Sequence, residues 1–388
     1  MALKKTTTKT ASKSTAKKAP AKKTTTAQTK TTAPKTTAKK KNPALEKLVA
    51  DINKKFGENA VSVGVLRNDD GSVKTIQRIP TGSIALDVAL GGGIPVGRYI
   101  EISGGLSTTK TTQCIHIVRQ AQKMGLQCGW FDIEGTTDEP YLIACGVDPD
   151  LLLYSRPDGM EEATQMAIDM QRSGVVDLVV IDSIAMLSPT KEQESTMDES
   201  TQMGLAPKLL GEFFRKIAAG NNRLFREGKP EFTVIGINQL REKIGAYGDP
   251  EYTPGGRAKG FMQSIDIRLR RGDWITQGSG KDKEFVGQVV KFMIEKNKTF
   301  KRMQTGEFDF YYMPNSAGVT PNYNDNEKSI VILGIEWGLI QKSGAWFSYN
   351  GQKYQGVPAL TEALRNDEKL FDELYKEVFK MTSQKLGA

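Results

Sequence analysis

One nine-residue stretch, Gly104 to Thr112, has most of the residues of a loop that binds phosphate groups. Its sequence, GGLSTTKTT, follows the pattern G-x-x-x-x-G-K-[ST], except that Thr109 takes the place of the second glycine. In such a loop, backbone N–H groups surround the phosphates, the lysine reaches the terminal phosphates, and the next hydroxyl ligates Mg²⁺. The stretch therefore predicts a nucleoside triphosphate site, with Lys110 on the phosphates and Thr111 on Mg²⁺.

Two acidic residues stand at the ends of apolar segments that follow this loop. In VDLVVIDS, Asp182 ends a segment typical of a buried strand, where a carboxylate can hold the magnesium shell. In FDIEGTTDEP, Glu134 ends another such segment and could orient or deprotonate an attacking water. Each feature alone is a weak signal, but the three together, in this order and at this spacing, favour a nucleotide hydrolase.

The threonine at position 109 leaves three interpretations open. A glycine before the lysine adopts positive φ without steric cost, whereas a β-branched residue resists it by about 1–3 kcal/mol. That penalty is modest beside the binding of a triphosphate with Mg²⁺. The loop could therefore work in altered form, bind nucleotide with impaired hydrolysis, or bind no nucleotide.

The segments around these residues predict an α/β fold. Short apolar segments, RYIEIS, QCGWFDIE, VDLVVIDS and FTVIGINQ, read as buried strands. Helical segments separate them, including KTTQCIHIVRQAQKMG and EEATQMAIDMQRSG. Alternation of this kind is typical of a mostly parallel, twisted sheet with helices on both faces.

The chain divides into four expected parts. Residues 1–42 form a Lys/Thr/Ala-rich basic tail. Residues 43–75 form an N-terminal arm that starts with an amphipathic helix, for which Asn42 can be the cap and Pro43 suits the first helical position. Residues 76–315 form the α/β core, and residues 316–388 form a small C-terminal α/β domain.

The basic tail accounts for the net positive charge of the chain. It holds thirteen lysines and no acidic residue, so the net charge of +9 leaves −4 for the rest. Such a composition buries too little apolar surface to order itself. We expect it to bind nucleic acid phosphates, with a solubilising linker and a transit peptide as the alternatives.

Composition also excludes several classes of protein. The single histidine, His116, rules out HExxH zinc sites and makes a Ser-His-Asp triad improbable; it falls in an apolar helix pattern, which favours a packing role. Three cysteines, Cys114, Cys128 and Cys145, lack metal-ligand spacing and fit buried thiols in a reducing compartment. No transmembrane or export segment is evident, so we expect a cytoplasmic protein without a membrane partner.

Several further motifs identify a family resemblance. They are TGSIALDVALGGGIPVGR, VDLVVIDSIAMLSP, MGLAPKLL, INQLREKIG, TPGGRAKGF, the KNK at 296–298, and GAWFSYNG. With the phosphate loop, they make the chain resemble the RecA recombinases from about residue 42 to residue 380. Some phage members also lack a glycine before the lysine, and a phage origin is one interpretation of this chain.

The resemblance implies ATP as the nucleotide and assigns its site. Glu134, with Lys110, would be catalytic, and Gln239 would sense the γ-phosphate and relay it to the DNA loops. Asp138, Tyr141 and Tyr312 would contact adenine, whereas Lys296 and Lys298 would reach ATP on a neighbouring subunit. The phosphates would be bound by Gly104, Gly105, Ser107, Thr108, Thr109, Lys110, Thr111 and Thr112, with Mg²⁺ on Thr111 and Asp182.

The resemblance also assigns two DNA-binding loops, about residues 192–204 and 245–261. The first is acidic and could instead be a solvated loop, and the second could be a mobile surface lid. An exposed arginine pair such as Arg270-Arg271 is by itself usually only solvated. The residues assigned to DNA are Met203, Gly204, Lys208, Arg215, Gly255, Gly256, Arg257, Phe261, Arg270 and Arg271.

These features together predict an ATP-dependent DNA strand-exchange recombinase that forms helical filaments on single-stranded DNA and serves recombinational repair. It would bind single- and double-stranded DNA and its own copies near the nucleoid, with single-strand-binding and loader proteins as further partners. One alternative is an ATP-binding filamentous protein that barely hydrolyses ATP. The other is a RecA-like hexameric helicase, which would form closed rings.

Overall fold

The computed structural model describes residues 42–57, 59–64, 75–195, 204–242, 251–314 and 318–385. Residues 1–41 of the expected basic tail lie outside this description. Contacts between residues divide the chain into two compact units, Met1–Glu46 and Lys47–Ala388. Apart from the start of the first helix, every element below belongs to the second unit.

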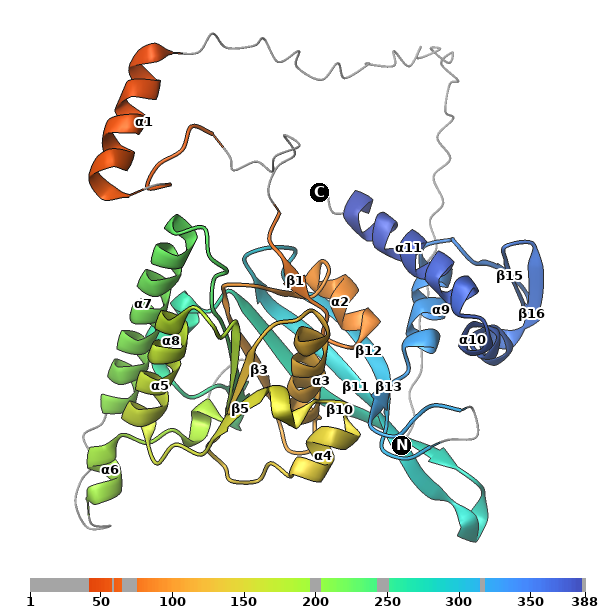
Figure 1. The fold of residues 1–388 in the computed structure, drawn as a ribbon. Helices are drawn as coiled ribbons and strands as arrows, with labels where there is room; N and C mark the ends of the chain where they lie inside the picture. Colours follow the sequence, from red (N-terminus) through yellow and green to blue (C-terminus); the bar gives the residue numbers. More distant parts are fainter. Residues whose placement is uncertain are drawn as a thin grey trace, which may run out of the picture. The chain divides into compact units, whose positions relative to one another are not determined.

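A nine-stranded sheet forms the centre of the second unit (Figure 1). Its strand order is β13-β12-β11-β10-β3-β7-β6-β4-β5, parallel from β10 to β5 and antiparallel from β10 to β13. The parallel strands are β3 (Tyr99–Gly104), β4 (Cys128–Asp132), β5 (Leu152–Ser155), β6 (Leu178–Asp182), β7 (Thr233–Gln239) and β10 (Ile265–Gln277). The antiparallel strands are β11 (Glu284–Asn297), β12 (Gln304–Tyr311) and β13 (Tyr323–Asn324). The expected fold class is confirmed.

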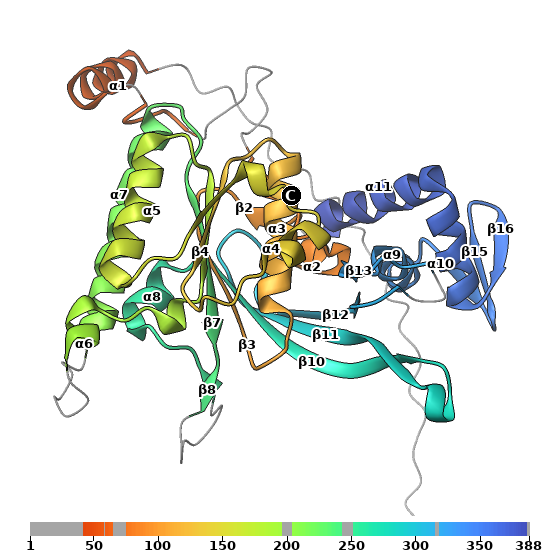
Figure 2. The same ribbon diagram turned by 60° about the horizontal axis from the view of Figure 1, so that its bottom comes forward.

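Helices cover both faces of this sheet (Figures 1 and 2). On one face, α3 (Lys110–Lys123) packs its Ile115 and Val118 against strand residues such as Val180. On the other face, α5 (Met160–Ser173) and α7 (Leu205–Arg226) pack against Val179 and Ile181. Successive residues of one strand thus point to opposite faces of the sheet. Because helices bury both faces, the strands are continuous apolar runs in the sequence.

Short elements complete the core. They are α2 (Ile84–Leu90), α4 (Glu139–Ala144), α6 (Thr190–Glu194), α8 (Gly256–Met262), the 3₁₀ turns at Pro149–Leu151, Ile184–Met186 and Gly280–Asp282, and the strand pairs β1 (Arg78–Ile79) with β2 (Ile94–Pro95) and β8 (Arg241–Glu242) with β9 (Glu251–Tyr252). Within the described ranges, no helix combines the length and the apolar character that a membrane crossing requires.

The helix expected after Asn42 is present as α1 (Pro43–Phe56). Its N-terminus forms as the sequence predicts, because Asn42 Oδ1 accepts a hydrogen bond from the Ala44 N–H at 3.1 Å. None of its residues is buried, and Leu48 and Phe56 are 54% and 59% exposed. An amphipathic helix with an exposed apolar side is suited to packing on another surface.

The C-terminal part combines helices with a small antiparallel sheet. Ile84 and Val88 of α2 join its apolar core, so this part packs on the α/β core. The boundary expected near residue 316 falls in 315–317, outside the described residues. The elements are α9 (Asn326–Glu336), β14 (Gln341–Ser343), β15 (Trp346–Tyr349), β16 (Gln352–Gln355), α10 (Gly356–Asn366) and α11 (Glu368–Lys385).

His116 occupies the packing role that the sequence favours. The side chain is fully buried in α3, and its Nε2 lies 2.9 Å from the Asn322 carbonyl oxygen. A carbonyl oxygen only accepts, so Nε2–H is the donor in the neutral ring. Burial and the nearby Arg119 lower the pKa of His116 to about 3.

This depressed pKa predicts a loss of stability in acid. Between pH 6.5 and about 3 the unfolded chain binds a proton at His116 that the folded chain does not, so the free energy of unfolding falls as pH falls. From pH 7.5 to pH 5 this amounts to about 2 kcal/mol. Urea unfolding of the full chain and of His116→Gln at both pH values measures it. An equal pH dependence in the two proteins would contradict the prediction.

Candidate nucleotide site and DNA-binding loops

The phosphate-loop segment connects the carboxyl end of β3 to the first turn of α3. Thr109 precedes this helix with φ 62° and ψ 21°, and Ser107 has φ 55°. Threonine therefore adopts the left-handed conformation for which glycine is ordinarily preferred. Gly104 is sterically required, because an added Cβ would lie 2.5 Å from both the Leu269 carbonyl oxygen and Thr108 Oγ1. The backbone at Thr109 thus has the positive φ that glycine would adopt without steric cost, and the three interpretations of this loop stay predictions.

Lys110 folds back over this loop. Its Nζ donates to the Gly105 carbonyl oxygen at 2.7 Å, and Thr108 Oγ1 donates to the same oxygen at 3.0 Å. Burial lowers the pKa of Lys110, while the carboxylates of Asp182 and Glu134 act in the opposite direction. A cation thus lies beside the helix N-terminus, where backbone N–H groups also attract anions.

Asp182 meets Thr111 beside the loop. Thr111 Oγ1 donates to Asp182 Oδ2 at 2.8 Å, and Asp182 is only 3% exposed at the end of β6. Burial, with the negative charges of Glu134 and Asp132, raises the pKa of Asp182 to about 6. A hydroxyl and a carboxylate are hard oxygen donors of the kind Mg²⁺ prefers, and a nearby cation would relieve the crowding of negative charge. The residues therefore fit a magnesium ion.

Glu134 receives hydrogen bonds from two other strand ends. Its Oε1 accepts from Ser183 Oγ at 2.7 Å and from Gln239 Nε2 at 3.0 Å. Glu134 follows β4, Ser183 follows β6, and Gln239 ends β7, so the three meet at the carboxyl edge of the parallel strands. Sequence reasoning named Glu134 and Gln239 but missed Ser183, whose only signal is its place directly after Asp182.

Of the two tyrosines assigned to adenine, Tyr141 contacts the last residue of the phosphate-loop segment. Tyr141 and Thr112 share a hydrogen bond of 2.8 Å between their hydroxyl oxygens, and burial raises the pKa of Tyr141 to about 12. Tyr312 packs partly buried against the same apolar core, edge-on to Phe310. Asp138 is exposed and precedes α4. Tyr141 therefore lies beside the phosphate loop, and contact of these three residues with a base stays a prediction.

The two lysines assigned to a neighbouring subunit bond to α8. Lys296 Nζ donates to the Gly260 carbonyl oxygen, and Lys298 Nζ donates to the Phe261 carbonyl oxygen at 2.8 Å. Phe261 itself is 76% exposed. Two cations and an exposed aromatic ring thus share one surface.

Only part of the first DNA-binding loop is described. Met203 lies outside the described residues, while Gly204 precedes α7 with φ 100°. Lys208 and Arg215 are exposed and seven residues apart in α7, so they lie on one side of the helix. Contact of these two side chains with DNA phosphates stays a prediction.

The second loop is described from residue 251 onward. Gly255 and Gly256 have φ 111° and 76°, and a Cβ on Gly256 would lie 2.8 Å from Pro207 Cβ. Their conformation and their packing against α7 thus require glycine, independently of DNA. The Arg257 side chain lies outside the description.

The arginine pair is not simply solvated. Arg270 forms an ion pair of 2.5 Å with Glu251, and Arg271 lies 5.1 Å from the Trp274 ring.

A contact that the sequence did not indicate connects α8 to β3, the strand that leads into the phosphate loop. Lys259 Nζ lies 2.5 Å from Glu101 Oε1, and both side chains are buried.

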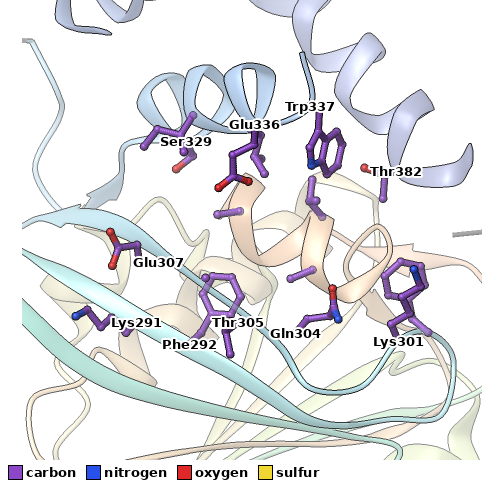
Figure 3. A pocket seen from close by; sticks show the side chains of 17 residues that line it. Lys291, Phe292, Lys301, Gln304, Thr305, Glu307, Ser329, Glu336, Trp337 and Thr382 are labelled. Atoms are coloured by element: carbon purple, nitrogen blue, oxygen red, sulfur yellow. The ribbon is translucent and has the colours of Figure 1, made fainter. Parts of the chain in front are cut away.

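A cavity of about 810 Å³ lies away from these residues, between α2, β11, β12 and α9 (Figure 3). Glu336, the last residue of α9, and Trp337, which follows it, extend toward the cavity, and Gln304 lines the opposite side. None of the residues assigned to ATP or DNA lines it. The cavity is therefore lined by a different set of residues from those that the sequence assigns to the nucleotide.

Two family models of known proteins match this chain, one over most of its length and one over its C-terminal part. The family model described as RecA N-terminal domain matches residues 43–317, and the one described as RecA C-terminal domain matches residues 328–383. Proteins called Protein RecA are similar over most of their length. The one from Frankia casuarinae is 40% identical over 350 residues, which cover 89% of this chain and 94% of that protein. The one from Acidothermus cellulolyticus is 39% identical with the same coverage, and the one from Heliobacterium modesticaldum is 38% identical over 86% of this chain and 91% of its own. The chain therefore belongs to the RecA family of recombinases.

Proposed function

We propose that this recombinase is a DNA-dependent ATPase, which couples ATP hydrolysis to the exchange of DNA strands. One observation carries the proposal: Ser183 and Gln239 both donate hydrogen bonds to Glu134 Oε1, at the strand edge where the phosphate loop begins. The site thus combines Lys110, whose positive charge would bind phosphates, with Glu134, whose carboxylate would orient a water molecule. Similarity extends through the C-terminal part as well, which favours a recombinase over a ring-forming helicase motor.

Each residue of the site would have its own role in ATP binding and hydrolysis. Lys110 and the loop N–H groups would bind the β- and γ-phosphates. Thr111 and Asp182 would hold Mg²⁺, which when bound neutralises phosphate charge. Glu134 is exposed to solvent and would orient a water and accept its proton, while Ser183 and Gln239 fix the carboxylate.

A chain of contacts would connect the nucleotide to DNA. Gln239 bonds to Glu134, and the preceding Asn238 donates to Glu101 Oε1 at 3.1 Å and to the Pro254 carbonyl oxygen at 3.0 Å. Pro254 stands directly before Gly255 of the second DNA-binding loop. A change in the Gln239 contact on hydrolysis would thus reach that loop through β7.

Assembly into a helical filament would complete the site. Lys296 and Lys298 would reach ATP held by an adjacent copy, from the surface that also exposes Phe261. The apolar side of α1 would pack on another copy. Single-stranded DNA would be contacted by Lys208, Arg215 and the two loops, and single-strand-binding and loader proteins are further candidate partners. We expect this activity in the cytoplasm, at the nucleoid.

The experiment that tests the proposal is phosphate release from ATP by the full chain, with and without single-stranded DNA. We expect release to require Mg²⁺ and to rise at least about tenfold with DNA, because the loop contacts couple the two sites. A rate that DNA leaves unchanged would favour the alternative of a filamentous protein with weak hydrolysis.

A further inference from the structure

Gln288 is a buried polar residue without an assigned role. It lies in β11, directly opposite Trp274 of β10 and Phe310 of β12, and its exposed fraction is 0%. Cross-strand partners point to the same face of a sheet, so its amide lies between two aromatic positions. An amide in such surroundings loses free energy unless it makes hydrogen bonds.

The amide reaches the phosphate loop. Gln288 Nε2 donates to the Ser107 carbonyl oxygen at 3.2 Å, across 181 residues of sequence. Oε1 makes no hydrogen bond with the described residues. The contact with Ser107 therefore decides which way the amide is turned, because a carbonyl oxygen needs a donor.

This bond fixes the orientation of one peptide unit. In a trans peptide the C=O and the N–H point in opposite directions, so drawing the Ser107 carbonyl toward β11 turns the Thr108 N–H the other way. Ser107 and Thr109, the two residues that flank Thr108, have positive φ of 55° and 62°. Neither is glycine, so both are held in a conformation of higher energy. Backbone N–H groups aligned by such alternation form an anion-binding concavity.

We propose that Gln288 is a positioning residue for the phosphate loop. By holding the Ser107 carbonyl, it keeps the loop in its phosphate-binding conformation although Thr109 replaces the glycine that would adopt this conformation freely. The inference rests on the proposed binding of ATP by this loop. It also explains why an amide, with its donor, stands among aromatic residues in β11.

The test combines two substitutions in the full chain. Gln288→Met keeps the volume and shape of the side chain but removes the donor, and Gln288→Leu repeats the test with a different apolar shape. Each is made alone and together with Thr109→Gly. The measured quantity is the Kd of a non-hydrolysable ATP analogue with Mg²⁺, and the thermal unfolding midpoint of each nucleotide-free variant is the control for folding.

We expect either Gln288 substitution to weaken binding about fivefold when Thr109 is present, which corresponds to one hydrogen bond. With Thr109→Gly the same substitution should weaken binding by less than about twofold, because glycine at position 109 adopts positive φ without cost and only Ser107 remains strained. Such a difference between backgrounds is what a double-mutant cycle detects. A residue that only stabilised the sheet would give equal effects in both.

Equal weakening in the two backgrounds, or no weakening in either, would overturn the inference. Lys110→Ala distinguishes this failure from failure of the proposed function. If the unsubstituted chain binds the analogue no more tightly than Lys110→Ala, both the ATP site and the role of Gln288 are wrong. If the unsubstituted chain binds tightly and the Gln288 variants match it, only the role of Gln288 is wrong.

Discussion

Lys110→Ala is expected to weaken binding of a non-hydrolysable ATP analogue by about a hundredfold or more and to abolish nucleotide-dependent assembly on DNA. The Lys110 ammonium lies over the loop, 2.7 Å from the Gly105 carbonyl oxygen, where it would make charge-assisted hydrogen bonds to phosphate. Each such bond contributes about 1.5–3 kcal/mol, so two lost bonds exceed a hundredfold in affinity. Titration of the full chain with the analogue measures the change.

A second lysine of the same helix supplies the matched control. Lys123 is exposed in the last turn of α3, at the opposite end from the loop. Lys123→Ala removes the same charge from the same helix and should leave the Kd within about twofold, because exposed charges at that distance are screened. Comparable weakening by the two substitutions, or tight binding by Lys110→Ala, would show that the loop does not bind the phosphates.

The second large effect is expected from Glu134→Gln. The amide retains the shape of the side chain but does not accept a proton, so hydrolysis should fall by about 10²- to 10⁴-fold. Binding of the ATP analogue should persist, since Lys110 and the loop are unchanged. Filaments formed with ATP should therefore stay assembled. Single-turnover phosphate release measures the chemical step, and light scattering measures the lifetime of the assembly.

Glu139→Gln is the control for this change, because Glu139 is an exposed carboxylate in the first turn of α4. It should hydrolyse ATP at close to the unsubstituted rate. If Glu134→Gln also hydrolysed ATP within about threefold of that rate, Glu134 would not be the general base. If DNA failed to stimulate the unsubstituted chain above Glu134→Gln, the weakly hydrolysing alternative would be preferred.

Much of the candidate site follows from sequence because of one property of parallel sheets. The carboxyl ends of neighbouring strands lie at one edge, so polar residues that follow apolar runs are brought together. Glu134, Asp182 and Gln239 each stand at such a position, and the structure places them at one edge. The helix after Asn42 was also predictable, because its cap and its first proline are local signals.

Contacts between distant segments were not predictable in the same way. The bonds from Ser183 to Glu134, from Lys259 to Glu101 and from Gln288 to Ser107 depend on the pairing and register of strands far apart in the chain. Nothing local in their sequences specifies these partners. The long β10–β11 hairpin, which carries Gln288, was likewise not expected from the sequence.

For the residues assigned to DNA, the sequence likewise predicted their positions but not their contacts with distant residues. The sequence places Arg270 and Arg271 at the surface, but their partners, Glu251 and Trp274, appear only in the fold. The glycines of the second loop suggest close approach to a strand of DNA. In the structure they are explained by positive φ and by the contact of Gly256 with Pro207. Their role toward DNA stays a prediction.

Electron microscopy of the full chain with single-stranded DNA, in the presence and absence of ATP, tests most directly whether a nucleotide bound between subunits holds a polymer on DNA. Extended helical filaments should form with ATP and Mg²⁺, and they should be lost without nucleotide or with Lys110→Ala. Closed rings, monomers on DNA, or filaments that form equally well without nucleotide would contradict it.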